Sequence, residues 1–235
     1  MRHFLALAFA AAVAACTTAP SPELEGVRLM GLMKVASGGA ALDAPTGFHE
    51  TGTALRDGEP ATYETWGDLR SLKSVSRQTF GGMTMASGFD GRTSWSAGPD
   101  GTVETDTSEK SVRDTRLGTY LTIAAYFYPD RFPARFDYVG LKEAEGETYD
   151  VVTVTPEGSA SVDLWLDRST HLLERISGMD GDTPFSGKVT RYEAVDGTMI
   201  GFELHQKQGE HTLVLTLSSY TFEDVPPELF APPAQ

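Results

Sequence analysis

Cys16 is the residue whose position most directly implies chemistry, because it is the only cysteine in the 235-residue chain. It follows Val13-Ala14-Ala15, at the end of an apolar run over residues 4–15. Such a run is too short to cross a bilayer, which takes about 20 residues, and is typical of the hydrophobic part of a secretory signal. Small residues that end in a cysteine form a bacterial lipobox, in which the cysteine is acylated and becomes the new N-terminus. An ordinary signal peptide beside a chance cysteine is the alternative.

The lipobox interpretation divides the N-terminal region into a signal peptide at 1–15 and an acylated tether at 16–22. Several acyl chains on one cysteine, palmitate among them, exceed the two signals that stable membrane anchoring requires. Position 17 is threonine, whereas aspartate at this position retains Gram-negative lipoproteins in the inner membrane. We therefore expect an outer-membrane anchor with the folded part in the periplasm.

The other residues that could do chemistry form no catalytic pattern. The sequence contains no Asp-Thr-Gly or Asp-Ser-Gly, no Gly-x-Ser-x-Gly, no phosphate-binding glycine loop and no His-Glu-x-x-His. A metal site would need His205 and His211, but a turn at Gln208-Gly209 would point them to opposite sides of a hairpin. Asp90 and Asp167 stand in turn-like contexts, where a carboxylate usually caps the turn. We therefore expect no enzyme activity, no metal and no cofactor.

The charge balance excludes other classes of partner. Asp and Glu number 33 against 19 Lys and Arg, which gives a formal net charge of -14. No surplus of cations is available to neutralise nucleic-acid phosphates or to dock on anionic lipid. The 40% hydrophobic content is enough for a folded core.

Hydrophobic periodicity predicts one mainly β domain over residues 23–235. A helix is expected at 24–38, and a second, apolar one within 106–128, opened by a capping box at Asp106 and Glu109 and ended by Pro129. Alternating residues separated by turn signals predict the strands. These are 49–56, 60–68, 71–80, 83–89, 93–97, 136–143, 149–155, 161–166, 172–177, 188–194, 199–207 and 212–222. So many strands must curl, so we expect one strongly curved antiparallel sheet, or half-open barrel, of 11–12 strands.

The apolar concave face of a curled sheet must be covered by other apolar residues, and the two predicted helices can cover it. Three late strands each place three apolar residues on one face: Val162/Leu164/Leu166, Ile200/Phe202/Leu204 and Leu213/Leu215/Leu217. Together with the inserted helix they predict either a filled core or the wall of an apolar ligand cavity. The candidate cavity residues are Leu117, Leu121, Tyr128, Leu164, Leu166, Phe202, Leu204, Leu213, Leu215 and Trp95.

The order of these segments resembles the outer-membrane lipoprotein-sorting superfamily, the LolA/LolB-like proteins. The segments that carry the resemblance are the lipobox, GFDGRTSW at 88–95, YDVVTVTP at 149–156, VDLWLDRSTHLLER at 162–175, RYEAVDGTMIGFEL at 191–204 and the ending FEDVPPELFAPP. Two of these segments, GFDGRTSW and LWLDRSTHLLER, also resemble the non-catalytic region that precedes a retropepsin-like protease domain in some bacterial proteins. The first resemblance implies a half-open antiparallel barrel whose concave face holds acyl chains.

The resemblance and the residues together imply a function without catalysis. We expect a membrane-anchored periplasmic lipoprotein that binds a lipid or acylated ligand in its concave cavity, with a role in lipoprotein or lipid trafficking. The soluble carriers of the family are not lipidated, which favours an anchored, receptor-like role over shuttling. The alternative is an accessory module of the cell envelope that has a filled core and a protein partner in place of a ligand.

Overall fold

The computed structural model describes residues 20–234. Its helices are α1 (Pro22–Ala36) and α2 (Glu109–Thr122), with short 3-10 helices η1 (Gly39–Asp43), η2 (Ala125–Phe127) and η3 (Pro227–Phe230). The strands are β1 (Gly47–Arg56), β2 (Glu59–Asp68), β3 (Lys73–Phe80), β4 (Met83–Phe89), β5 (Ser94–Ala97), β6 (Val103–Asp106), β7 (Ala134–Ala144), β8 (Glu147–Pro156), β9 (Val162–Asp167), β10 (Leu173–Asp180), β11 (Thr183–Val195), β12 (Thr198–Gln208) and β13 (His211–Phe222). The predicted signal peptide and Cys16 lie outside the described residues.

All 13 strands form one antiparallel sheet in the order β6-β5-β4-β3-β2-β1-β13-β12-β11-β10-β9-β8-β7. Strands adjacent in sequence pair with each other, except β6 and β7, and the pairing of β1 with β13 joins the two halves of the meander. Strands β6 and β7 are the edges, so the sheet stays open. The predicted half-open, mainly β architecture is confirmed. The thirteenth strand is β6, whose four residues are too few to show the alternation that predicts a strand.

Tight hairpins set the register of the sheet. Asp57 and Gly58, between β1 and β2, both have positive φ angles, of 50° and 88°. Asp196 and Gly197, between β11 and β12, repeat the arrangement at 48° and 79°. Positive φ at both central residues belongs to the turn that matches the right-handed twist of paired strands, and Asp-Gly favours it.

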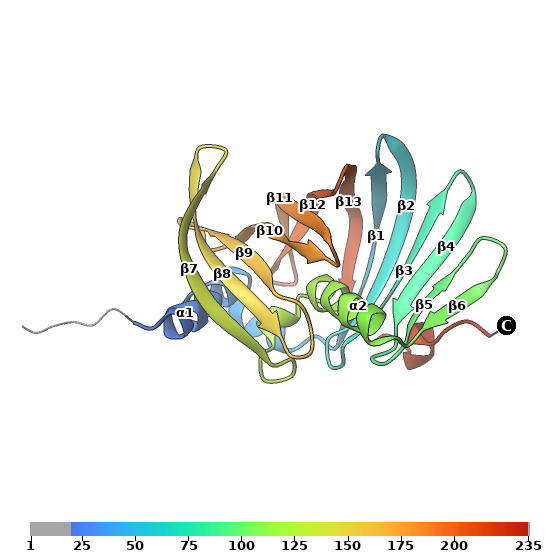
Figure 1. Ribbon diagram of the computed structural model, residues 1–235, viewed down its shortest axis with the longest axis horizontal. Coiled ribbons are helices and arrows are strands. Elements are labelled where there is room, and N and C mark those ends of the chain that lie inside the picture. Colours follow the sequence, from blue (N-terminus) through green and yellow to red (C-terminus); the bar gives the residue numbers. More distant parts are fainter. Residues whose placement is uncertain (1–19, 235) are drawn as a thin grey trace, which may run out of the picture.

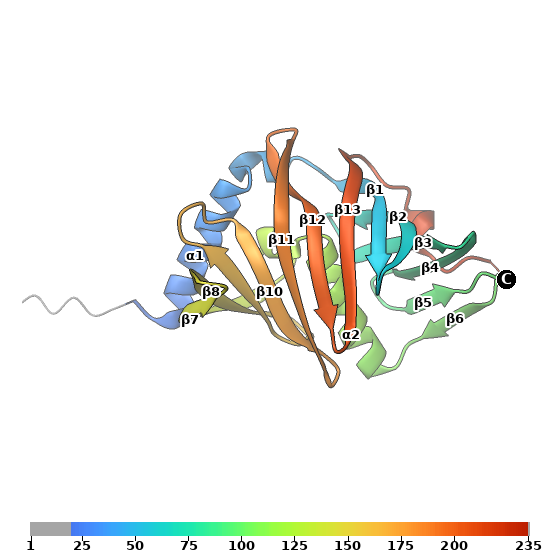
Figure 2. The ribbon, with the colours of Figure 1, turned by 90° about the horizontal axis from the view of Figure 1, so that it is seen from above.

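Helix α1 closes one end of the concave face. Ser21 caps it by accepting a hydrogen bond from the Leu24 backbone N–H at 3.3 Å, and Pro22 occupies its first turn. A Cβ on Gly26 would lie 2.4 Å from the carbonyl oxygen of Phe136, so the helix backbone rests directly on β7. Figures 1 and 2 show α1 beside β7 and β8, with α2 inside the curve of the sheet.

Helix α2 differs from its prediction at both ends. Its N-cap is Ser108, which accepts a hydrogen bond from the Ser111 N–H at 3.3 Å; Asp106 instead accepts from the Ser108 N–H at 2.7 Å. The helix ends at Thr122, well before Pro129, because Ala124 adopts a left-handed conformation with φ of 48°. Residues 125–127 then form η2, so the expected continuous apolar helix to residue 128 is wrong.

Apolar residues also pack on the convex side of the sheet. Trp66, Val75 and Trp95 form a cluster with Phe230 of η3. The Trp95 indole N–H donates to the Phe230 carbonyl oxygen at 2.9 Å. The C-terminal segment therefore covers the outer face of strands β2–β5. Among residues 20–234, no helix is long and apolar enough to span a membrane.

Candidate ligand cavity

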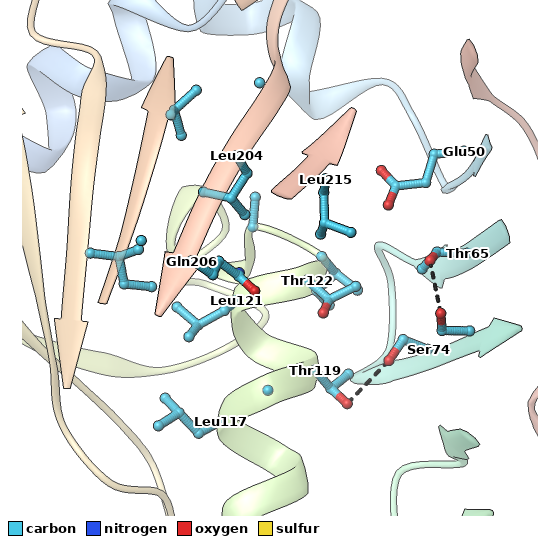
Figure 3. Close-up of a pocket in the computed structure, with 18 of the residues that line it drawn as sticks. Glu50, Thr65, Ser74, Leu117, Thr119, Leu121, Thr122, Leu204, Gln206 and Leu215 are labelled. Atoms are coloured by element: carbon cyan, nitrogen blue, oxygen red, sulfur yellow. Dashed lines mark hydrogen bonds between the residues drawn. The ribbon is translucent and has the colours of Figure 1, made fainter. Parts of the chain in front are cut away.

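A cavity of about 740 Å³ lies between α2 and the concave face of the sheet. Its wall comes from α2 and from strands on both sides of the β1–β13 junction. Leu117 and Leu121 reach it from the helix, and Leu204 and Leu215 face them from β12 and β13 (Figure 3). The volume lies within the roughly 300–1,000 Å³ range of small-molecule sites.

Seven of the ten predicted residues border this cavity. They are Leu117, Leu121, Tyr128, Leu204, Leu213, Leu215 and Trp95. Trp95 touches it only in part, because most of its contacts belong to the convex cluster around Phe230. Leu217 and Tyr220 continue the wall along β13. They are three residues apart, and both face the concave side because Ser218 is an extra, bulged residue between them.

Leu164 and Leu166 do not border the cavity, which corrects the expectation for them. Their exposed fractions are 0% and 1%, and they belong to the same core cluster as Leu29 and Met33 of α1. At the β7–β9 end of the concave face, α1 packs on β7 and β8, and its residues join Phe127 of η2 and Phe132 in this cluster. Residues at that end are packed core.

Phe202 is also misplaced by the prediction. Regular alternation would put it on the same face as Leu204, but the β11–β12 pairing is irregular between Val189 and Tyr192. The irregularity shifts the register, and Phe202 lies beneath the Arg191 guanidinium, 5.5 Å from the ring centre. It is buried there, outside the cavity wall.

Polar residues on the opposite wall were not predicted. Glu50, Thr65, Ser76 and Ser87 are consecutive cross-strand partners on β1–β4, and all four border the cavity. Burial raises the pKa of Glu50 to about 7, and a hydrogen bond from the Thr65 side chain opposes this rise. Short alternating Ser and Thr residues in these strands were the available signal. The sequence does not show which face of these strands is concave, so it did not identify them as part of the cavity wall.

The histidines and the turn aspartates lie apart from the cavity. Gln208 pairs with His211, so the turn is Gly209-Glu210 and the predicted register was wrong by one residue. The His205 ring pairs with Glu203 at 2.8 Å and that of His211 with Asp57 at 2.8 Å. No group of three or more metal-ligating side chains occurs within residues 20–234.

Asp90 and Asp167 cap turns, as predicted. Asp90 Oδ1 accepts from the backbone N–H groups of Arg92 and Thr93, at 2.8 and 2.7 Å. The Asp167 carboxylate accepts from the side chain and backbone of Ser169 and Thr170. The hydrogen bond from the Ser169 hydroxyl is the largest of the effects that lower the Asp167 pKa, to about 2.

Three solved structures share this arrangement of helices and sheet. A DUF1329 family protein from Desulfovibrio piger superposes with a TM-score of 0.62 at 14% identity, over 90% of this chain and 98% of its own. A LolA superfamily protein from Nitrosomonas europaea gives 0.58 at 15% identity, over 83% and 97%. The chain has the LolA-like fold. A Vibrio parahaemolyticus domain, described as an outer membrane lipoprotein-sorting protein, gives 0.55 at 11% identity, over 86% and 93%.

No family model and no curated protein sequence matches the chain. The likeness to the LolA superfamily therefore rests on backbone architecture. The resemblance to the region that precedes retropepsin-like domains receives no support from these comparisons.

Proposed function

We propose that this protein is a membrane-anchored lipoprotein of the Gram-negative envelope that binds a lipid or acylated ligand between α2 and the sheet, without catalysis. The observation that carries the proposal is the cavity of about 740 Å³ whose helical and β12–β13 walls are leucine-rich. Leucine side chains that face a cavity of this size gain apolar contacts when an apolar ligand enters it, which favours a ligand.

The LolA-like fold supports the same proposal. Two structures with this fold carry lipoprotein-sorting or LolA names. The alternative, an accessory module with a filled core, would require the walls to be in contact. The two functions differ in whether purified protein takes up an apolar molecule.

Leu121→Gln should weaken binding of 1-N-phenylnaphthylamine, an uncharged apolar probe, about tenfold. The side chain projects from α2 toward Leu204 and Gln206 (Figure 3), so an amide there removes apolar contact with the probe. Loss of about 1.4 kcal/mol of contact energy corresponds to this factor. We expect the melting temperature to fall only slightly, since the new amide faces an open space and stays hydrated. Fluorescence titration and thermal unfolding measure the two effects.

Leu141→Gln is the matched control for this change. Leu141 lies on β7, is 54% exposed and is distant from the cavity wall. It should leave probe affinity unchanged. Absence of probe binding by the wild type, together with a collapse in stability for Leu121→Gln, would favour the filled-core alternative.

The anchoring part of the proposal rests on Cys16 alone. Cys16→Ser should abolish incorporation of labelled palmitate and leave unprocessed precursor, because the acyl acceptor is lost. Thr17→Asp should move the protein from the outer to the inner membrane, whereas Thr17→Asn should do so less. Equal labelling of wild type and Cys16→Ser would exclude acylation at this residue.

A further inference from the structure

The cavity has two chemically different walls. On one side, Leu204 of β12 and Leu213, Leu215 and Leu217 of β13 present aliphatic side chains. On the other side, a polar row crosses β1–β4 through Glu50, Thr65, Ser76 and Ser87. Figure 3 shows Glu50, Thr65 and Ser74 across the space from Leu204 and Leu121. A ligand that fills the space would meet an apolar surface at one end and hydroxyl groups at the other.

The polar row is not required by the core of these strands. Trp66, Val75 and Trp95 of these strands form the convex cluster. Ala54, Ala61 and Tyr63 share the concave face with the polar row and pack against Leu213, Leu215 and Leu217. Thr65 donates to the Ser76 hydroxyl at 3.3 Å, and the hydroxyls of Ser74 and Thr119 lie 3.2 Å apart. Thr65 also forms the hydrogen bond to Glu50, so its one proton is already used, but each of these hydroxyl oxygens can still accept, since a hydroxyl donates once and accepts twice.

Two hydroxyl groups of the cavity wall have no hydrogen-bond partner among the described residues. The Oη atom of Tyr63 and the Oγ1 atom of Thr198 are both buried, and both residues border the cavity. A buried polar atom without a partner costs about 1–3 kcal/mol. Tyr63 neighbours Glu50, whose negative charge contributes to raising the tyrosine pKa after the larger effect of burial. A polar ligand group beside Glu50 would provide the missing partner for Tyr63.

The charge of the wall decides which polar groups fit. Its acidic residues are Glu50, Asp114 and Asp180, and Lys207 is the one cationic residue bordering the cavity in the described chain. Asp114 is paired with Lys110 at 2.7 Å, so a phosphate or carboxylate head group against the polar row would meet the carboxyl group of Glu50 and no arginine of the wall. An uncharged hydroxyl group can donate to Glu50 or Thr65 and accept from Tyr63 or Ser76.

We propose that the ligand is an amphiphile with an uncharged, hydroxyl-bearing head group, of the monoacylglycerol class. Its acyl chain lies along β12, β13 and α2, and its head group lies against the polar row of β1–β4. The inference rests on the proposed function, because it assigns the ligand class of the same cavity. It adds a direction of binding and a discrimination against anionic amphiphiles of equal chain length.

Competition against 1-N-phenylnaphthylamine at pH 8 tests the inference. Monomyristoylglycerol should displace the probe at about one-tenth the concentration required for myristoyl lysophosphatidate, which has the same chain and an anionic head. The double variant Thr65→Val/Ser76→Ala should bring this ratio near one, mainly by weakening monomyristoylglycerol. Ser76→Ala alone should shift the ratio in the same direction, and it serves where the double variant loses its folded circular dichroism spectrum.

Thr79→Val/Thr84→Val is the matched control. These two threonines form a hydroxyl pair at 2.9 Å on the neighbouring part of β3–β4, outside the cavity. The control should keep the tenfold preference. Equal displacement by both amphiphiles in the wild type would overturn the head-group inference and leave the proposed function standing. Failure of the probe and both amphiphiles to bind would overturn the two together.

Discussion

Replacing Leu164 by glutamine should lower the free energy of unfolding by about 5 kcal/mol. Leu164 is fully buried in the core cluster with α1, so the change removes apolar contacts and buries an amide. Large-to-small core changes cost about 2–5 kcal/mol, and an unsatisfied polar group adds about 1–3 kcal/mol. A loss of this size approaches the whole stability of an ordinary domain, about 5–15 kcal/mol. Urea unfolding followed by circular dichroism measures it.

Leu215→Gln is the informative comparison, since it makes the same chemical change on the cavity wall. Leu215 is only partly buried and faces the open space, where the amide of Gln206 already lies (Figure 3). We expect a loss of about 1 kcal/mol, because the new amide can be hydrated. Equal losses at the two positions would mean that the space is closed in solution, and this would contradict the cavity and the function proposed from it.

Glu50→Gln should make the protein more stable than the wild type at pH 8, by about 2 kcal/mol. Burial raises the pKa of Glu50 from 4.5 to about 7, so the folded state disfavours the ionised carboxylate. The wild type therefore loses stability as the pH rises from about 4.5 through 7, and below 4.5 the group contributes no difference. One pKa unit corresponds to about 1.4 kcal/mol, and partial hydration of the side chain reduces the full value.

The groups that face Glu50 do not titrate in this range. Tyr63 on β2 and Tyr220 on β13 both have pKa values raised by burial and, to a smaller extent, by the Glu50 charge. Urea unfolding of wild type and Glu50→Gln between pH 4 and 8 should give curves that diverge with rising pH. Glu59→Gln, at an exposed position on β2, should give a curve parallel to the wild type. Parallel curves for Glu50→Gln would show that the carboxyl is solvated.

The secondary structure was predicted from local sequence signals, and most of the predicted strands and turns are present in the fold. Asp-Gly turns and alternation over three or more pairs located twelve strands, because a hairpin and its register are determined within about ten residues. Helix α1 was located by its apolar spacing and by Pro22 near its start. Strand β6 was not predicted, because it is defined by its pairing with β5 and not by a pattern in its own residues. Ala124 ended α2 early through a backbone conformation that residue type alone does not indicate.

The candidate site was predictable only in part, because the sequence shows which face of an element is apolar but not which other segment covers it. Leu121 and Leu215 were identified because both lie on apolar faces of long, regular elements. Leu164 has the same local pattern, yet residues of α1 and η2, which are distant from it in sequence, complete the core cluster around it. Phe202 was misassigned by a shift in register between two strands, which alternation along one strand does not reveal.

The sequence by itself determined most element types, the Asp-Gly turns, the acidic charge and the position of the single cysteine. These follow from residue properties over short windows. The tertiary structure decided which faces are concave, where α1 fills the interior and where a cavity stays open. It also brought Glu50 into line with Thr65, Ser76 and Ser87 from four different strands. The physical reason is that burial and cross-strand alignment depend on contacts between segments that are distant in the chain.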